Sequence, residues 1–111
     1  MDGTFTLEAT TAVDDGAAPA RSVLAQNHPN PFNPSTEIRF SLPTRQPITL
    51  RIYDVAGREV ATLAEGPHDA GTHVRVWRGE DDAGARVSSG LYFYRLTTET
   101  GAETRKMTLL K

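Results

Sequence analysis

The sequence predicts an all-β fold, an antiparallel sandwich, for a chain of 111 residues. Apolar and polar residues alternate with a period of two in one segment after another, as they do in strands with one buried face. Glycines fall between these segments, where turns often need positive φ angles. The segments are short and regularly spaced, which favours antiparallel pairing over a parallel sheet with helices.

Six segments carry the alternation: residues 37–42, 48–53, 58–63, 72–77, 91–98 and 106–110. In the segment 72–77 we expect Val74 and Val76 to face the core. Only residues 64–70 are compatible with a helical turn. With one further strand, the pattern predicts an immunoglobulin-like antiparallel β-sandwich of about seven strands.

Composition divides the chain into three parts. Residues 14–23 are small, polar and helix-breaking, which is typical of a linker. Residues 1–13, in which Phe5 and Leu7 alternate with polar residues, are interpreted as the end of a preceding region or a tail. Residues 24–111 form the predicted compact domain.

Charge and composition exclude several function classes. Twelve basic and fourteen acidic side chains give a net charge of −2, which does not fit nucleic-acid binding. No apolar run reaches the ~18 residues of a membrane span. The chain has no cysteine, so thiolate metal sites and disulfides are excluded. We expect no cofactor.

A proline- and asparagine-rich segment, residues 28–36, precedes the first clear strand. Its three X-Pro pairs favour extended backbone, and the missing amide donors argue against a central strand. Asn30 and Asn33 are predicted to form Asx-turns with nearby backbone amides. We predict a stiff strap, anchored by Phe32, that fixes where the first strand begins and also serves as a recognition epitope. Its central motif is Asn30, Pro31, Phe32, Asn33 and Pro34.

Four motifs occur in order along the chain: residues 30–34, 53–60, 90–96 and 105–111. This series resembles the C-terminal sorting domain of the type IX (Por) secretion system of the Bacteroidetes and related bacteria. A second resemblance, in residues 77–92, is to the Ig-like domain of flagellar hook-capping proteins. The two families share a fold, and the strap and the lysine-rimmed last segment favour sorting. Beyond the strap, the resemblance marks Tyr53, Asp54, Gly57, Arg58, Gly90, Tyr92, Arg105, Lys106 and Lys111 as motif residues.

The resemblance implies a delivery role. The parent protein would fold in the periplasm, and an outer-membrane translocon would recognise the domain. A sortase-like protease would then cut between about residues 14 and 26 and join the parent to a lipopolysaccharide at the cell surface. The chain would be the substrate of that protease and not an enzyme, and we expect a monomer.

Two alternatives remain from the sequence. In the first, an accessory domain of a secreted hydrolase binds a polysaccharide by stacking of Trp77, if strict alternation places this side chain on the outer face. We favour instead a bulge near Trp77 that turns it inward. In the second, the domain is structural, similar to a hook cap or an adhesin, and associates through an edge strand.

Other clusters are interpreted as ordinary structure. The acidic run 80–82 before Gly84 lacks the alternating ligands of a calcium loop and is predicted to be a hairpin turn, with a weak calcium site as the alternative. The three histidines lack metal-ligand spacing. No serine has the context of an activated nucleophile. The basic residues Arg58, Arg105, Lys106 and Lys111 are proposed to form a patch for an acidic receptor surface.

Overall fold

The structure is a computed structural model that describes residues 21–110. This part of the chain contains seven strands and no helix, which confirms the predicted all-β, Ig-like sandwich. No helix in the described part is long and apolar enough to cross a membrane. The strands are β2 (Val23–Leu24), β3 (Thr36–Leu42), β4 (Gln46–Tyr53), β5 (Glu59–His68), β6 (Gly71–Trp77), β7 (Gly90–Thr98) and β8 (Gly101–Leu109).

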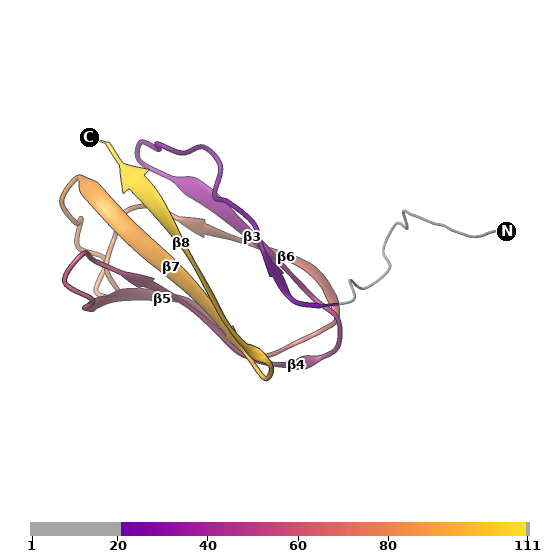
Figure 1. Cartoon of the computed structure of the whole chain (residues 1–111). Coiled ribbons are helices and arrows are strands. Elements are labelled where there is room, and N and C mark those ends of the chain that lie inside the picture. The colour runs from indigo at the N-terminus through magenta and orange to yellow at the C-terminus, as the bar shows by residue number, and fades with distance from the viewer. Residues whose placement is uncertain (1–20, 111) are drawn as a thin grey trace, which may run out of the picture.

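The strands form two antiparallel sheets (Figure 1). One sheet has three strands in the order β2-β3-β6, and the other has four in the order β5-β4-β7-β8. The chain changes sheets between β3 and β4, between β5 and β6, and between β6 and β7. This exchange encloses one core between the two layers.

The core comes from the alternation seen in the sequence. On β3 and β4 every second side chain is buried, and the polar residues between them face outward. Tyr94, Leu96 and Met107 close the core from β7 and β8. Each fully buried side chain of this size stabilises the fold by roughly 1.5–3 kcal/mol relative to leaving it in water.

Strand β6 has the opposite orientation to the one predicted. Val74 and Val76 are 38% and 43% exposed, whereas Trp77 is 2% exposed. The ladder between β3 and β6 runs without a bulge and places Trp77 beside Thr36. Trp77 therefore faces the core by ordinary alternation. The expected inward valines and the expected bulge were both wrong, because the register against β3 decides which face is buried.

Two strands, β5 and β8, extend several residues beyond their predicted bounds. Strand β5 continues to His68, so the helical turn considered for residues 64–70 does not form. A register shift between Leu50 and Arg51 accommodates one extra residue in β5. Strand β8 begins at Gly101 instead of residue 106. Both extensions are polar or proline-containing, and pairing with a neighbouring strand outweighs their weak intrinsic preference.

The edges of the sheets differ in how they are covered. At the edge of β5, Asp82 hydrogen-bonds to the strand as a residue of a neighbouring strand would. Its Oδ1 accepts a hydrogen bond from Thr62 N (2.9 Å), and its N–H donates to Val60 O (3.3 Å). This part of the β5 edge is therefore not available for another strand.

The edge of β6 is more open. Arg39 O accepts a hydrogen bond from Ala25 N, so its backbone faces β2 and the Arg39–Val74 pair is a non-hydrogen-bonded one. The backbone groups of Val74 consequently point to the open edge. Val74 O accepts a hydrogen bond from Arg75 Nη1 (2.9 Å). An inward-facing charged residue thus guards the middle of this edge.

Candidate recognition surface

The strap covers the edge of β8. Phe32 N donates to Thr108 O (3.0 Å), and Leu110 N donates to Phe32 O (2.8 Å). Asn30 Oδ1 accepts from Thr108 N (3.0 Å). These bonds satisfy backbone groups that would otherwise form an exposed sheet edge. The predicted Asx-turn of Asn30 was wrong, since its side chain bonds to a residue 78 positions away. Asn33 makes no side-chain hydrogen bond within residues 21–110.

The strap is fixed from its inner side as well. Phe32 is 1% exposed and lies 5.7 Å from Trp77, ring centre to ring centre. Asn27 is 3% exposed, and its Nδ2 donates to Thr36 Oγ1 (3.0 Å) and Pro29 O (3.1 Å). The three X-Pro bonds of the segment are cis. The contacts of Phe32 and Asn27 make the strap part of the folded domain.

Asn27 was missed from the sequence although it is central to this arrangement. Its N–H donates to the hydroxyl of Tyr94 (2.7 Å), and that hydroxyl donates to Ala25 O (2.7 Å). Burial raises the pKa of Tyr94 above its ordinary value of 10.0. Only its position one residue before His28-Pro29 distinguishes Asn27 in the sequence, and that is a weak signal.

The second motif forms a tight turn between β4 and β5. Asp54 Oδ1 accepts hydrogen bonds from Ala56 N (2.9 Å) and Arg58 N (3.0 Å), and Oδ2 accepts from Arg58 Nε (3.0 Å). The backbone hydrogen bond from Arg58 holds the pKa of Asp54 below its ordinary value of 3.8, against the effect of burial. Gly57 has a φ of 85°, which explains the glycine. The hydrogen bonds and the backbone conformation of the turn thus account for Asp54, Gly57 and Arg58 in this motif.

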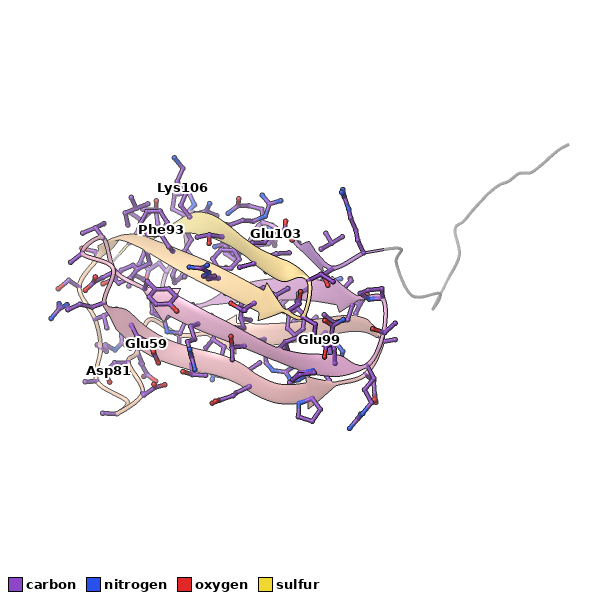
Figure 2. The ribbon with its side chains drawn as sticks, turned by 60° about the horizontal axis from the view of Figure 1, so that its bottom comes forward. Glu59, Asp81, Phe93, Glu99, Glu103 and Lys106 are labelled. Atoms are coloured by element: carbon purple, nitrogen blue, oxygen red, sulfur yellow. The ribbon has the colours of Figure 1, made fainter. Side chains whose placement is uncertain are left out.

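A row of side chains crosses the outer face of the four-stranded sheet (Figure 2). The ladders pair Glu59 with Tyr53, Tyr53 with Phe93, and Phe93 with Lys106. Tyr53 and Phe93 are half-buried, and Lys106 is exposed. We call these four residues the outer row. It places an aromatic pair between an anionic end and a cationic end.

The basic residues do not share one face. Arg105 pairs with Tyr94 and faces inward, and its Nε donates to Leu24 O. Lys106 is the next residue and faces outward. Arg58 lies in the Asp54 turn, and Lys111 is outside the described residues. Arg105 and Lys106 therefore do not lie on one surface, and Arg105 fastens β2 to β8.

The aromatic residues at the strap end form a closed cluster. Trp77 Nε1 donates to Glu80 O (2.8 Å), and the rings of Trp77 and Tyr92 are 5.2 Å apart. The hydroxyl of Tyr92 donates to Ser88 O (2.6 Å), and burial raises the pKa of Tyr92 above its ordinary 10.0. Gly90, with a φ of 142°, begins β7 just before this cluster. Trp77 is thus too buried to stack on a sugar.

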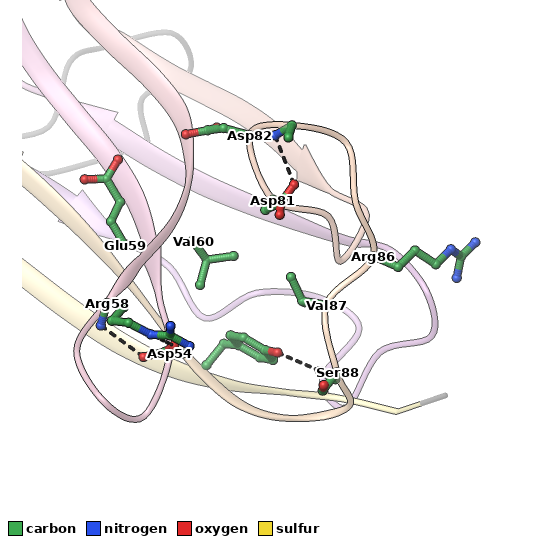
Figure 3. A pocket seen from close by; sticks show the side chains of 11 residues that line it. Asp54, Arg58, Glu59, Val60, Asp81, Asp82, Arg86, Val87 and Ser88 are labelled. Carbon is green, nitrogen blue, oxygen red and sulfur yellow. Dashed lines mark hydrogen bonds and ion pairs between the residues drawn. The ribbon is translucent and has the colours of Figure 1, made fainter.

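An open cleft of about 570 Å³ lies between the Asp54 turn and residues 81–88 (Figure 3). Asp81 Oδ1 accepts hydrogen bonds from Ala83 N and Ala85 N (both 2.9 Å), so the acidic run forms a turn of the same kind as the Asp54 turn. The described residues contain no group of three potential metal ligands. The cleft is lined by Asp54, Glu59, Asp81 and Asp82, and no histidine of the described residues lines it.

Fold and surface define an Ig-like β-sandwich domain with a strapped edge. The sequence model of the FlgD Ig-like domain matches residues 32–102. The chain belongs to this family. No curated protein matches the sequence.

Solved structures share the fold. Dimeric latent PorU from Porphyromonas gingivalis matches with a TM-score of 0.65 and 22% identity, over 92% of this chain and 10% of PorU. PorZ, an essential surface component of the type IX secretion system of the same organism, matches with 0.55 and 18%, over 81% of this chain and 11% of PorZ. FlgD from P. aeruginosa matches with 0.52 and 19%, over 86% of this chain and 74% of FlgD. The chain thus spans about a tenth of PorU and PorZ.

Proposed function

We propose that this domain is a sorting domain of the type IX secretion system, which directs an exported parent protein through the outer membrane to the cell surface. The observation that carries the proposal is the joining of two motifs into one unit. The strap (residues 30–34) is hydrogen-bonded to Thr108 and Leu110 at the end of β8. A translocon can read both motifs only in the folded domain, which suits recognition after folding in the periplasm.

The likeness to PorU and PorZ supports the proposal at the level of the fold. In this function the chain acts as a substrate, and a sortase-like protease removes it upstream. Because a protease needs an accessible extended backbone, we propose that the cut lies in the part of the predicted range, residues 14–26, that precedes β2. Leu24 is buried, and its N–H donates to Glu103 Oε1 (3.0 Å), so a cut beyond β2 would require local unfolding.

The surface proposed for contact is the outer row with the exposed strap. Lys106 is its cationic end, and an acidic receptor surface would pair with it. Arg105 is not proposed as a contact, because its guanidinium is bonded to Leu24 O.

The test is delivery of a reporter fused ahead of the full chain, expressed with a signal peptide in a bacterium that has the type IX system. We expect the wild-type fusion at the cell surface and the Lys106→Gln/Lys111→Gln variant retained in the periplasm. Arg39→Gln is the matched control, since Arg39 is an exposed cation on the outer face of the other sheet. A deletion of residues 106–111 that is still delivered at the wild-type level would rule out the sorting role.

A second candidate is a structural domain that packs against neighbours, as a hook-cap protein does. The family match favours it, and the open edge of β6 offers a place for pairing. Sedimentation of the purified chain distinguishes the two functions. Concentration-dependent self-association of the wild-type chain would favour the structural role, and a monomer would favour sorting.

A further inference from the structure

A cavity of about 320 Å³ lies beside the end of the strap. Its walls come from three separate parts of the chain: the end of the strap, the residues that follow β6, and the end of β8. The lining residues are Asn33, Pro34, Arg78, Gly79, Arg86, Leu109 and Leu110. Its volume is at the low end of the range of small-ligand pockets, about 300–1,000 Å³.

The walls are held in place by the backbone. Val87 N donates to Gly79 O (3.0 Å), and Glu80 forms a bridge with Arg86, so the two arginine-bearing segments are joined. Gly79 has a φ of 72°, and a Cβ there would lie 3.2 Å from Leu109 Cδ2. The backbone at Gly79 therefore lies close against the Leu109 side chain of β8. A cavity built in this way does not need to be ordered when a ligand binds.

The chemistry of the lining has two parts. Leu109, Leu110 and Pro34 supply apolar surface, and Leu110 is 48% exposed. Arg78 and Arg86 supply two exposed guanidinium groups, and none of the lining residues is acidic. Neither arginine forms an ion pair with a carboxylate of residues 21–110. Arg86 also lines the rim of the acidic cleft, but its side chain points outward from that cleft (Figure 3).

We propose that this cavity, which we call the Arg78–Arg86 pocket, binds a carboxylate that is attached to a small apolar group. Arginine pairs with carboxylates through two parallel hydrogen bonds, and the leucines accept the apolar part. The occupant is an acidic side chain next to an apolar residue on a partner protein. The assignment of the partner to the secretion machinery rests on the proposed function. The binding chemistry of the pocket does not depend on that function.

The test uses hexanoate, which carries a carboxylate on an apolar chain, and follows the backbone amide signals of the full chain by NMR. We expect hexanoate to shift the Gly79 and Leu110 signals saturably. Neutral hexanamide should bind at least about tenfold more weakly, because charge-assisted hydrogen bonds are roughly twice as strong as neutral ones. Inorganic phosphate, which lacks the apolar part, should leave Leu110 unshifted.

The Arg78→Gln/Arg86→Gln variant should lose hexanoate binding, and the Arg39→Gln/Arg95→Gln control should keep it. Arg39 and Arg95 are exposed strand positions that do not line the cavity. Should the double variant fail to fold, Arg78→Gln and Arg86→Gln are measured singly, each with a several-fold loss expected. Equal binding of hexanamide, an equal response to phosphate, or unchanged binding by the arginine variants would overturn the proposal. The outcome is independent of the reporter experiment, so the two proposals fail separately.

Discussion

The strap is anchored by one aromatic side chain, and removing that side chain tests whether strap and sandwich fold as a unit. Phe32 is 1% exposed and packs against Trp77, with the ring centres 5.7 Å apart. Phe32→Ala should lower the free energy of unfolding by about 3–5 kcal/mol, through lost burial and the cavity left behind. A domain of this size has a total stability of about 5–15 kcal/mol, so the variant should be folded but much less stable.

A second pair of variants isolates the edge contact from the anchor. Asn30→Ala leaves Thr108 N–H without its acceptor and should cost about 0.5–1.5 kcal/mol. Asn33→Ala is the matched control, because Asn33 is exposed and makes no side-chain hydrogen bond within residues 21–110. Its effect should stay within about 0.5 kcal/mol.

Urea unfolding measures all three free energies, and hydrogen exchange at the Thr108 amide reports on the edge. Exchange should accelerate in Asn30→Ala and stay unchanged in Asn33→Ala. A loss below about 1 kcal/mol in Phe32→Ala would show that the strap is not anchored through the core, because a fully buried phenylalanine loses more than that on truncation. Equal effects of the two asparagine variants would refute the contact at β8.

Three further predictions follow from single residues. Gly79→Ala should lower the free energy of unfolding in urea more than Gly84→Ala does. Both glycines have positive φ, which costs an alanine about 1–2 kcal/mol, but only at residue 79 does the new Cβ have a neighbour at 3.2 Å. Equal losses in the two variants would contradict this. Arg75→Thr should leave Val74 O without its hydrogen bond and cause self-association that sedimentation detects. Adding Val74→Lys should reverse this self-association. A monomeric Arg75→Thr variant would show that Arg75 does not protect the β6 edge from pairing. Burial raises the pKa of Tyr94, so the stability that its neutral phenol contributes is complete below the unfolded pKa of 10.0 and is lost as pH rises through the folded value. Tyr94→Phe should flatten this loss at high pH, and an unchanged slope would contradict the assignment.

Strand β6 shows where sequence reasoning ended: Trp77 was expected to face inward and does, but it does so by ordinary alternation and not through the expected bulge. Val74 and Val76 carry the more apolar side chains of their segment, so local alternation pointed to them as core. The register against β3 instead buries Trp77 and leaves the valines exposed. An edge strand can expose valines at little cost because one face of the sheet meets water.

The basic residues show the same limit. The resemblance grouped Arg105 and Lys106 in one patch, but neighbouring residues in a strand face opposite sides of the sheet. The pocket between Arg78 and Arg86 was not foreseen either, since its walls come from residues 33–34, 78–86 and 109–110. No local pattern reports that three distant segments meet.

The sequence by itself determined the fold class, most of the strands and the position of the strap, because alternation, glycine turns and prolines act within a few residues. The tertiary structure decided which face of β6 is buried, which edge the strap covers and which charges lie together. Those outcomes depend on pairing between residues up to 81 positions apart, and the free energy of such contacts exists only once the two sheets have met.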